Sequence, residues 1–338
     1  MPEVMASWLD RVPPARPARS EALAAVTAAG PASRVRVAII GGSHGGLACA
    51  CSLIAAGFDP SSIAVFERSP EGRGGGAGVM TDDLSVAILK GVGALSDEVS
   101  RKRVHPMRVQ EERVGCSGHR LARDDDFPCF SAYRADVHVQ LKERLPAGVV
   151  RWGKGLQSFT QQPARAGEPA QVVLEFADGE TLSCELLIGA DGPTSGVRSK
   201  AEPPPPRWRG GLRYAGYHAW RGVLPRSACP DAAFQQLKEE YADCQYTNNP
   251  HHNHSHNHGA ERMLGNTVGN CLYFITSNSS GPRLHAVLYE LGGELINWLI
   301  YVASDEPVCA GKATMAAPPD MLATLHAEIE DVYGSALA

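Results

Sequence analysis

A glycine cluster directly after a short apolar run constrains the fold of this chain more than any other feature. The run Val35–Ile40 has the length and composition of a buried parallel strand, and Gly41, Gly42, Gly45 and Gly46 follow it at once. Small, helix-compatible residues come next, and a second apolar stretch then ends in an acid. The order strand, glycine turn, helix, strand and acid predicts the βαβ unit that binds dinucleotides.

The residue types in this unit suit the groups of a dinucleotide. We expect the helix at Leu47–Ala56, ended by Gly57, and the second strand at Ser62–Phe66, closed by Glu67. A helix N-terminus presents N–H groups and a partial positive charge to a pyrophosphate, and glycine lets the phosphates approach closely. Glu67 lies 21 positions after Gly46, near the spacing of about 20 at which a carboxylate meets the adenosine ribose.

One position departs from the pattern G-x-G-x-x-G. Ser43 stands where the middle glycine is expected, but serine is small and still offers its backbone N–H. A single glycine cluster is weak evidence in a chain with 35 glycines, so a purely structural turn is the alternative. The strand–turn–helix–strand context favours nucleotide binding, with Gly41, Ser43, Gly45 and Gly46 at the pyrophosphate and Glu67 at the ribose.

Length and charge limit the class of protein. A chain of 338 residues predicts one large or two medium domains with an ample core. The net charge of -5 gives no electrostatic footprint for nucleic acid, and no apolar run approaches the ~20 residues of a membrane helix. Nine scattered cysteines without C-x-x-C spacing, and no secretory signal, indicate a reducing compartment.

Composition shifts suggest where the domains begin and end. Residues 1–33 are rich in Ala and Pro, which favours a disordered tail, with an organelle transit peptide as the alternative, so we expect a cytoplasmic or organellar protein. A nucleotide-binding domain is expected at 34–202. The prolines Pro203–Pro206 then form a stiff connector. A second domain at 207–305 and a C-terminal helical segment at 306–338 complete the prediction.

The remaining pattern predicts an α/β fold. Amphipathic helices are expected at Asp82–Gly93, Tyr133–Leu145 and Met321–Val332. The turn Asp178–Gly179 predicts a hairpin of Val172–Phe176 and Thr181–Cys184, and another short strand is expected at Leu186–Ala190. In the second domain an antiparallel sheet is predicted from Tyr214–Val223, Cys271–Ser277, Leu284–Glu290 and Glu294–Val302.

A histidine-rich segment invites a metal-site interpretation. Asn248–Gly259 holds five of the twelve histidines, but its Asn, Pro and Gly content indicates a disordered insertion. No second, ordered set of ligands stands nearby in the sequence, so we predict no metal site.

Several separated segments agree on a family. They are the G-G-S-x-G-G-L turn with VFERSP, the stretch GAGVMTDDLSVAILKGVG, the helix YRADVHVQLKERLP with Arg134, the signature D-G-x-x-S-x-x-R in ELLIGADGPTSGVRSK, and YAGYHAWRG at Tyr214–Gly222. Together they cover roughly Arg34 to Val302. The chain resembles the FAD-dependent class A aromatic monooxygenases of the p-hydroxybenzoate hydroxylase superfamily, and within it the branch of 2,6-dihydroxypyridine hydroxylase.

The resemblance implies a Rossmann-like FAD-binding domain with an antiparallel-sheet substrate domain. It implies an enzyme that takes a hydride from NAD(P)H onto FAD, reacts with O2, and hydroxylates a small aromatic or heteroaromatic substrate through a flavin C4a-hydroperoxide. Arg68 and Arg134 would contact phosphate or ribityl oxygens, and Asp191 and Gly192 would close the cofactor groove. A homodimer is compatible with this picture.

The resemblance points to no catalytic side chain. His218 or Tyr217 could face the substrate, but alternation along a strand equally makes either one a packed core residue, which is the interpretation we favour.

One family feature is missing. The family's third cofactor motif, a strand that ends in G-D, has no match after Asp191, so we expect a truncated chain or a natively incomplete protein. Two alternatives therefore stay open: a non-catalytic or partner-completed FAD-binding remnant, and another oxidoreductase of the superfamily, such as an isoprenoid reductase. The Trp220–Gly222 run disfavours the reductase.

Overall fold

The computed structural model describes residues 34–71, 76–96, 98, 104–107, 109–114, 119–127, 129–164, 170–201, 213–229, 232, 271–276, 284–292, 295–307 and 315–333. The predicted tail 1–33, the connector Pro203–Pro206 and the insertion 248–259 lie outside the described residues. The chain divides into two compact units, each with its own sheet. The first comprises Met1–Gly75, Val86–Ser96 and Ala135–Arg213, and the second comprises Gly76–Ser85, Asp97–Arg134 and Tyr214–Ala338.

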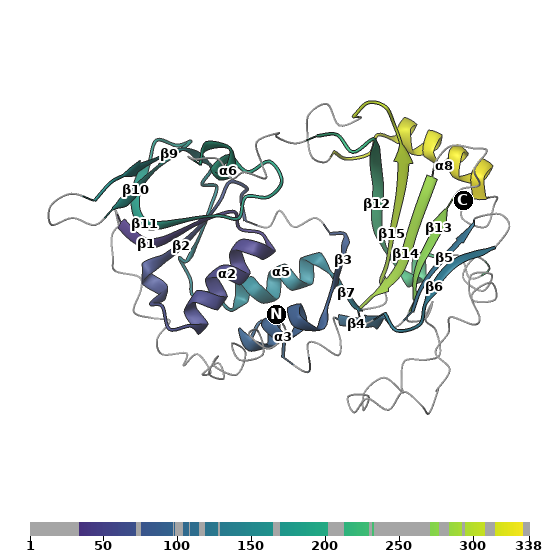
Figure 1. Ribbon diagram of the computed structural model, residues 1–338, viewed down its shortest axis with the longest axis horizontal. Coiled ribbons are helices and arrows are strands. Elements are labelled where there is room, and N and C mark those ends of the chain that lie inside the picture. Colours follow the sequence, from purple (N-terminus) through teal and green to yellow (C-terminus); the bar gives the residue numbers. More distant parts are fainter. Residues whose placement is uncertain are drawn as a thin grey trace. The chain divides into compact units, whose positions relative to one another are not determined.

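The first unit is built on a six-stranded sheet (Figure 1). Its order is β8 (Val150–Trp152), β2 (Ile63–Glu67), β1 (Arg34–Ile40), β11 (Thr181–Gly189), β10 (Gln171–Phe176) and β9 (Leu156–Gln162). The strands from β8 to β11 pair in parallel, whereas β9 and β10 are antiparallel additions. The parallel part is the Rossmann-like sheet that the sequence predicts, and the β10–β11 hairpin turns at Gly179 with φ +84°.

Apolar side chains cover both faces of this sheet. On one face α2 (His44–Ala55) and α5 (Arg134–Glu143) lie side by side, and Leu47, Cys51 and Leu141 pack there with strand residues (Figure 1). On the other face the Phe66 and Phe176 rings lie 4.6 Å apart, and both are completely buried. Burial on both faces explains why β1 and β2 are nearly continuous hydrophobic runs.

Two strands differ from the prediction. The segments predicted at Thr181–Cys184 and Leu186–Ala190 form one continuous strand, β11, which ends at Gly189, and its register with β1 is the same on both sides of Glu185. Strand β9 was not predicted, since its sequence LQSFTQQ is polar and its alternation is weak. Such a strand lies at the sheet edge, where pairing to one neighbour decides its conformation more than burial does.

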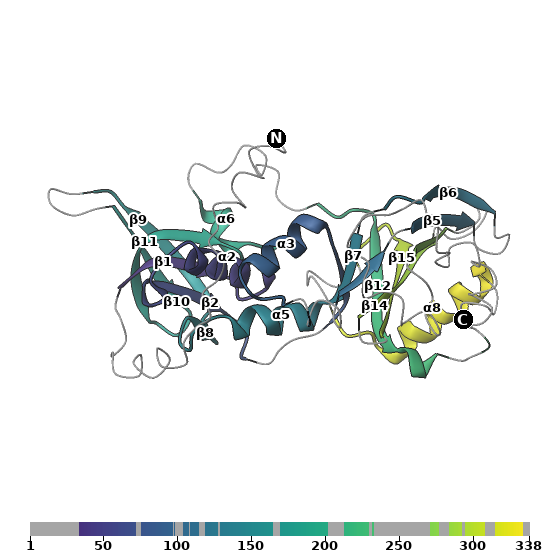
Figure 2. The same ribbon diagram turned by 90° about the horizontal axis from the view of Figure 1, so that it is seen from below.

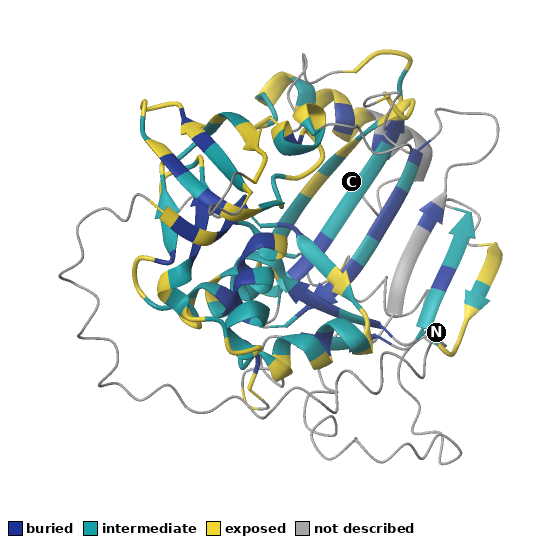
Figure 3. Ribbon diagram, turned by 60° about the vertical axis from the view of Figure 1, so that its left-hand side comes forward, coloured by how far each residue is buried: buried dark blue, intermediate teal, exposed yellow. Residues whose placement is uncertain are grey.

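The second unit also contains a six-stranded sheet. Its order is β12 (Tyr217–Pro225), β15 (Leu295–Ala303), β14 (Leu284–Leu291), β13 (Cys271–Thr276), β5 (Val109–Val114) and β6 (Arg120–Asp124). The four predicted strands pair in the antiparallel sense, as expected, and β5 joins β13 in parallel. Figure 2 shows β6 at the sheet edge, and Figure 3 shows its exposed residues in yellow. The predicted fold class is therefore confirmed.

Smaller elements cover the two faces of the second sheet. Helix α8 (Pro319–Tyr333) packs on one face through Leu325 and Ile329. On the other face a sheet of β3 (Gly78–Thr81), β7 (Cys129–Tyr133) and β4 (Val104–Met107) contributes Met107 and Cys129 to a cluster with Tyr289. The other short elements of the described residues, taken over both units, are α3 (Asp83–Gly91), α6 (Gly196–Lys200), and the 3-10 turns Pro60–Ser62 and Arg226–Ala228.

The turn between β1 and α2 depends on glycine at two positions. Gly41 has φ +112°, a conformation that a residue with a Cβ rarely adopts. Gly46 is buried against the carbonyl oxygen of Gly41, and a Cβ at Gly46 would overlap that oxygen. Gly45, one position earlier, is exposed and has no heavy atom within 4 Å of where its Cβ would be.

Neighbouring alanine substitutions should therefore change stability in opposite directions. Gly46→Ala should lower the free energy of unfolding by at least about 2 kcal/mol, because the helix must move off the Gly41 carbonyl. Gly45→Ala should raise it by up to about 1 kcal/mol, because alanine favours the helix more than glycine does. Guanidinium denaturation of the two variants and the unsubstituted chain measures both changes. Equal shifts for the two variants would contradict the packing described here.

Candidate cofactor site

The glycine turn lies where the carboxyl ends of three strands meet. The Gly41 N–H donates to the carbonyl oxygen of Phe66 in β2 (2.9 Å). On its other side Gly41 contacts the backbone after β11, since a Cβ there would overlap the Ala190 carbonyl and lie 2.9 Å from the Asp191 nitrogen. Open α/β sheets bind ligands at this edge, outside the carboxyl ends of their strands.

The first turn of α2 has the features of an anion site. Ser43 is the N-cap residue, but its side chain makes no capping hydrogen bond, and no acidic residue occupies the first turn. The Leu47 N–H donates to the Ser43 carbonyl (3.0 Å). The backbone N–H groups of Gly45 and Gly46 therefore come before the i→i−4 hydrogen bonds of the helix. With Gly45 exposed, this end of the helix can accept a negatively charged group.

Glu67 lies beside the glycine turn, as the spacing predicts. Its Oε2 accepts the Gly42 N–H (2.8 Å), and its Oε1 accepts the Ser69 N–H (2.8 Å). Gly42 has to be small here, because a Cβ would lie 2.7 Å from the Glu67 Cβ. The structure thus brings the predicted residues Gly41, Ser43, Gly45, Gly46 and Glu67 together at one edge of the sheet.

His138 also belongs to this site, although sequence reasoning did not find it. Its Nε2 lies 2.9 Å from the carbonyl oxygen of Gly42, 96 positions away in the chain. Its ring lies 6.2 Å from the His44 ring and 6.2 Å from Trp152. No spacing within α5 signals this contact, because only the packing of α5 beside α2 creates it.

Asp191 lies at the same edge, but its carboxylate is engaged by the helix that follows. It accepts the Gly196 N–H (2.7 Å), the Val197 N–H (3.1 Å) and the Ser195 hydroxyl. The Ser195 hydroxyl in turn accepts the Arg198 N–H (2.9 Å), and the Arg198 guanidinium bonds the carbonyls of Gly192 and Pro193. The residues of the D-G-x-x-S-x-x-R signature therefore hydrogen-bond to one another at the start of α6. Gly192 has φ +82°, and its Cβ position is open.

The two predicted arginines, Arg68 and Arg134, lie on segments other than the glycine turn. Arg68 follows Glu67 directly and is exposed. Arg134 begins α5, its N–H donates to the Ala77 carbonyl (3.1 Å), and it falls in the second unit. Their roles at a cofactor remain predictions.

Tyr217 and His218 point to opposite faces of the second sheet. His218 lies on the side of α8, with its ring 5.9 Å from Trp220, which packs on the cluster of Leu325 and Ile329. Tyr217 is 47% exposed, and its ring is 5.5 Å from Tyr301. Neither position singles out an acid or base, and we assign no catalytic residue.

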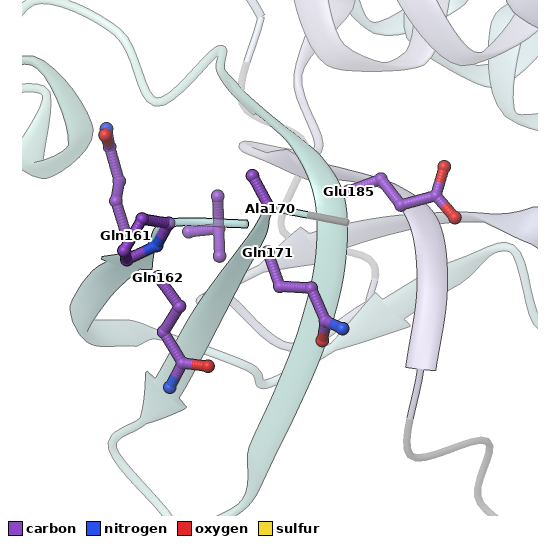
Figure 4. A pocket seen from close by; sticks show the side chains of 7 residues that line it. Gln161, Gln162, Ala170, Gln171 and Glu185 are labelled. Carbon is purple, nitrogen blue, oxygen red and sulfur yellow. The ribbon is translucent and has the colours of Figure 1, made fainter. Parts of the chain in front are cut away.

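A cavity of about 300 Å³ in the first unit lies away from the glycine turn (Figure 4). It is lined by Gln161, Gln162, Pro163, Ala170, Gln171, Val172 and Glu185. Figure 4 shows the Glu185 carboxylate pointing away from the glutamines, and it pairs with Arg34 (3.5 Å) and Arg36 (3.3 Å) at the start of β1. These pairs place the cavity beside the amino half of β1 and not at the carboxyl edge with the glycine turn, so it is not favoured as the cofactor site.

The thiol of Cys51 in α2 has a structural role. It donates to the Leu141 carbonyl (3.5 Å), and burial raises the pKa of the thiol to about 11, which keeps it protonated and unreactive near neutral pH.

Within the described ranges, no three metal-ligating side chains converge. Likewise, no helix in the part of the chain that the structure describes is long and apolar enough to cross a membrane.

Comparison with known proteins agrees with this geometry. Residues 34–207 match the family described as FAD binding domain. The chain is 33% identical to 3-amino-4-hydroxybenzoate 2-monooxygenase of Streptomyces cremeus over 58% of this chain and 48% of that protein. It is 32% identical to 6-hydroxynicotinate 3-monooxygenase of Bordetella bronchiseptica over 56% of this chain and 48% of that protein. The chain thus spans about half the length of the curated relatives it matches.

The fold also matches a solved structure. 2,6-Dihydroxypyridine-3-hydroxylase from Arthrobacter nicotinovorans aligns with a TM-score of 0.62 at 21% identity, over 91% of this chain and 70% of that one. This similarity confirms the fold, and the family match together with the curated relatives confirms the resemblance drawn from the sequence motifs. Through the match over residues 34–207, which includes the glycine turn, Glu67 and Asp191, the chain belongs to the FAD binding domain family.

Proposed function

We propose that this chain is part of an FAD-dependent monooxygenase, and that the N-terminus of α2 holds the FAD pyrophosphate. The observation that carries the proposal is the first turn of α2, which has no acidic residue, no side-chain cap and an exposed Gly45 with open space beside it. A side chain at Gly45 would stand where phosphates must approach. The residues present therefore fit the ADP half of the cofactor.

Glu67 keeps the capacity to bind the adenosine ribose. Each of its oxygens accepts one backbone N–H, from Gly42 and from Ser69. An ionised carboxylate has about four lone-pair sites, so about two remain for the ribose hydroxyls. The two backbone contacts also hold the carboxylate in one orientation, which lowers the entropy lost on binding.

The reaction we propose is the hydroxylation of a small aromatic or heteroaromatic compound. FAD would supply the redox chemistry, because it accepts a hydride from NAD(P)H and allows an oxygen atom of O2 to reach the substrate. The chain's own residues bind and orient the cofactor at the glycine turn. Support comes from the relatives, whose names specify hydroxylated benzoates and pyridine carboxylates as substrates. A cytoplasmic or organellar location and a homodimer stay proposals.

The non-catalytic alternative gains no support from these comparisons. Each relative compared above is named as a monooxygenase or hydroxylase. We therefore prefer the enzyme to the FAD-binding remnant, and to the isoprenoid reductase.

A charge at Gly45 tests the pyrophosphate site directly. Gly45→Asp should weaken FAD binding by about 100-fold, because a carboxylate about 4 Å from the phosphates repels them. Gly45→Asn is the matched control, since it has the same size without the charge, and it should weaken binding about tenfold or less. Fluorescence titration with FAD measures both. Gly46→Asp is less informative, because any side chain there collides with the Gly41 carbonyl.

The stability of the same variants separates charge from misfolding. An aspartate in the first turn favours the helix dipole, so FAD-free Gly45→Asp should be at least as stable as Gly45→Asn. Equal FAD affinity for the two variants would contradict the placement of the pyrophosphate.

The proposed activity predicts substrate-dependent consumption of NAD(P)H. The FAD-loaded chain should oxidise NADH or NADPH faster when a hydroxylated benzoate or hydroxypyridine is added, and mass spectrometry should find a product one oxygen atom heavier. Oxygen uptake without any added aromatic compound serves as the control. Rates that no aromatic compound changes, with no hydroxylated product, would contradict the monooxygenase proposal.

A further inference from the structure

We propose that His138 is a positioning residue for the cofactor, and that it acts by fixing the peptide groups of the glycine turn. The inference rests on the proposed FAD site and extends it to a residue outside the βαβ unit. Three residues form what we call the Gly42 clamp: Glu67, Gly42 and His138. Glu67 accepts the Gly42 N–H at 2.8 Å, and the His138 Nε2 lies 2.9 Å from the Gly42 carbonyl oxygen.

The direction of the histidine hydrogen bond is settled by its partner. A carbonyl oxygen only accepts, so the His138 Nε2 carries the hydrogen and donates it to Gly42. That hydrogen is present in both the neutral Nε2–H tautomer and the protonated ring. The rings of His44 and Trp152 each lie 6.2 Å from the His138 ring.

The clamp fixes the peptide plane on each side of Gly42. In a trans peptide the C=O and the N–H point in opposite directions. Because the Gly42 N–H points at Glu67, the Gly41 carbonyl points the other way, toward α2, where Gly46 has no side chain to obstruct it. Because the Gly42 carbonyl points at His138, the Ser43 N–H is directed away from His138.

This second peptide is the one that matters for the cofactor. Ser43 is the N-cap of α2, so its N–H stands among the donors that open the helix. Gly42 itself has no side chain to restrain its backbone, and glycine loses more conformational freedom on ordering than any other residue. A donor from a separate helix therefore holds the turn ready for the phosphates, and less order has to be gained when they bind.

The clamp also couples two parts of the adenosine site. Glu67 is the proposed ribose ligand, and its strand partner in β8 is Trp152, whose ring lies beside His138. These side chains therefore hold the Glu67 carboxylate, proposed to bind the ribose, at a fixed position relative to the glycine turn, proposed to bind the pyrophosphate.

Two substitutions at His138 distinguish a positioning role from a packing role. His138→Leu replaces the imidazole with an apolar side chain of similar size that has no hydrogen-bond donor, and it should weaken FAD binding by about tenfold. His138→Gln restores a side-chain N–H at similar reach and should return the affinity to within about twofold. Val139→Ala, at an exposed position of the same helix, is the control and should leave FAD affinity unchanged.

A measurement on the FAD-free chain provides a readout independent of the cofactor. Hydrogen exchange of the peptide that covers residues 41–46 should be about tenfold faster in His138→Leu and close to normal in His138→Gln. A packing role alone would lower the melting temperature of both variants alike and would give no rescue by glutamine.

The outcomes separate the inference from the proposed function. If the unsubstituted chain binds FAD and His138→Leu binds it equally well, the inference is wrong. If the unsubstituted chain binds no FAD, the proposed function fails. The exchange rates then decide whether His138 holds the turn: unchanged exchange in His138→Leu would overturn the clamp, and faster exchange that glutamine reverses would support it.

Discussion

The close approach of α2 to the Gly41 carbonyl is the constraint on which the candidate site depends. It requires glycine at position 46, a left-handed backbone at Gly41, and a peptide plane turned toward the helix. Because the helix starts so close to the end of β1, its first N–H groups lie at the carboxyl edge of the sheet. Glu67 then reaches the same edge from the neighbouring strand and bonds the turn. The proposed pyrophosphate site thus follows from packing as much as from the identity of the residues that form it.

The sequence predicts those features that depend on local pattern. The apolar runs of β1 and β2, the glycine turn and the carboxylate of Glu67 lie within one βαβ unit, so their spacing alone indicates their arrangement. The four antiparallel strands of the second sheet were also predicted from their local sequence, because each is rich in apolar, β-branched or aromatic residues. Family resemblance identifies the fold class, and the matched domain confirms it.

Contacts between distant segments were beyond the reach of sequence patterns. His138 meets Gly42 across 96 positions, and nothing in the helix that carries it marks this residue among the other polar ones. Strand β9 is polar and owes its conformation to pairing with β10. In each case a tertiary interaction decided what the local sequence left open.

The most direct test is competition for the FAD site by the two halves of the cofactor. We propose that the residues from the glycine turn to Glu67 bind the ADP end of FAD, so ADP should displace FAD from the purified chain. FMN, which lacks the adenosine and its phosphate, should displace it poorly. Calorimetric titration of FAD in the presence of each competitor measures this difference. A chain that binds FAD but is not affected by ADP, or that FMN competes for equally well, would contradict the assignment of the α2 N-terminus to the pyrophosphate.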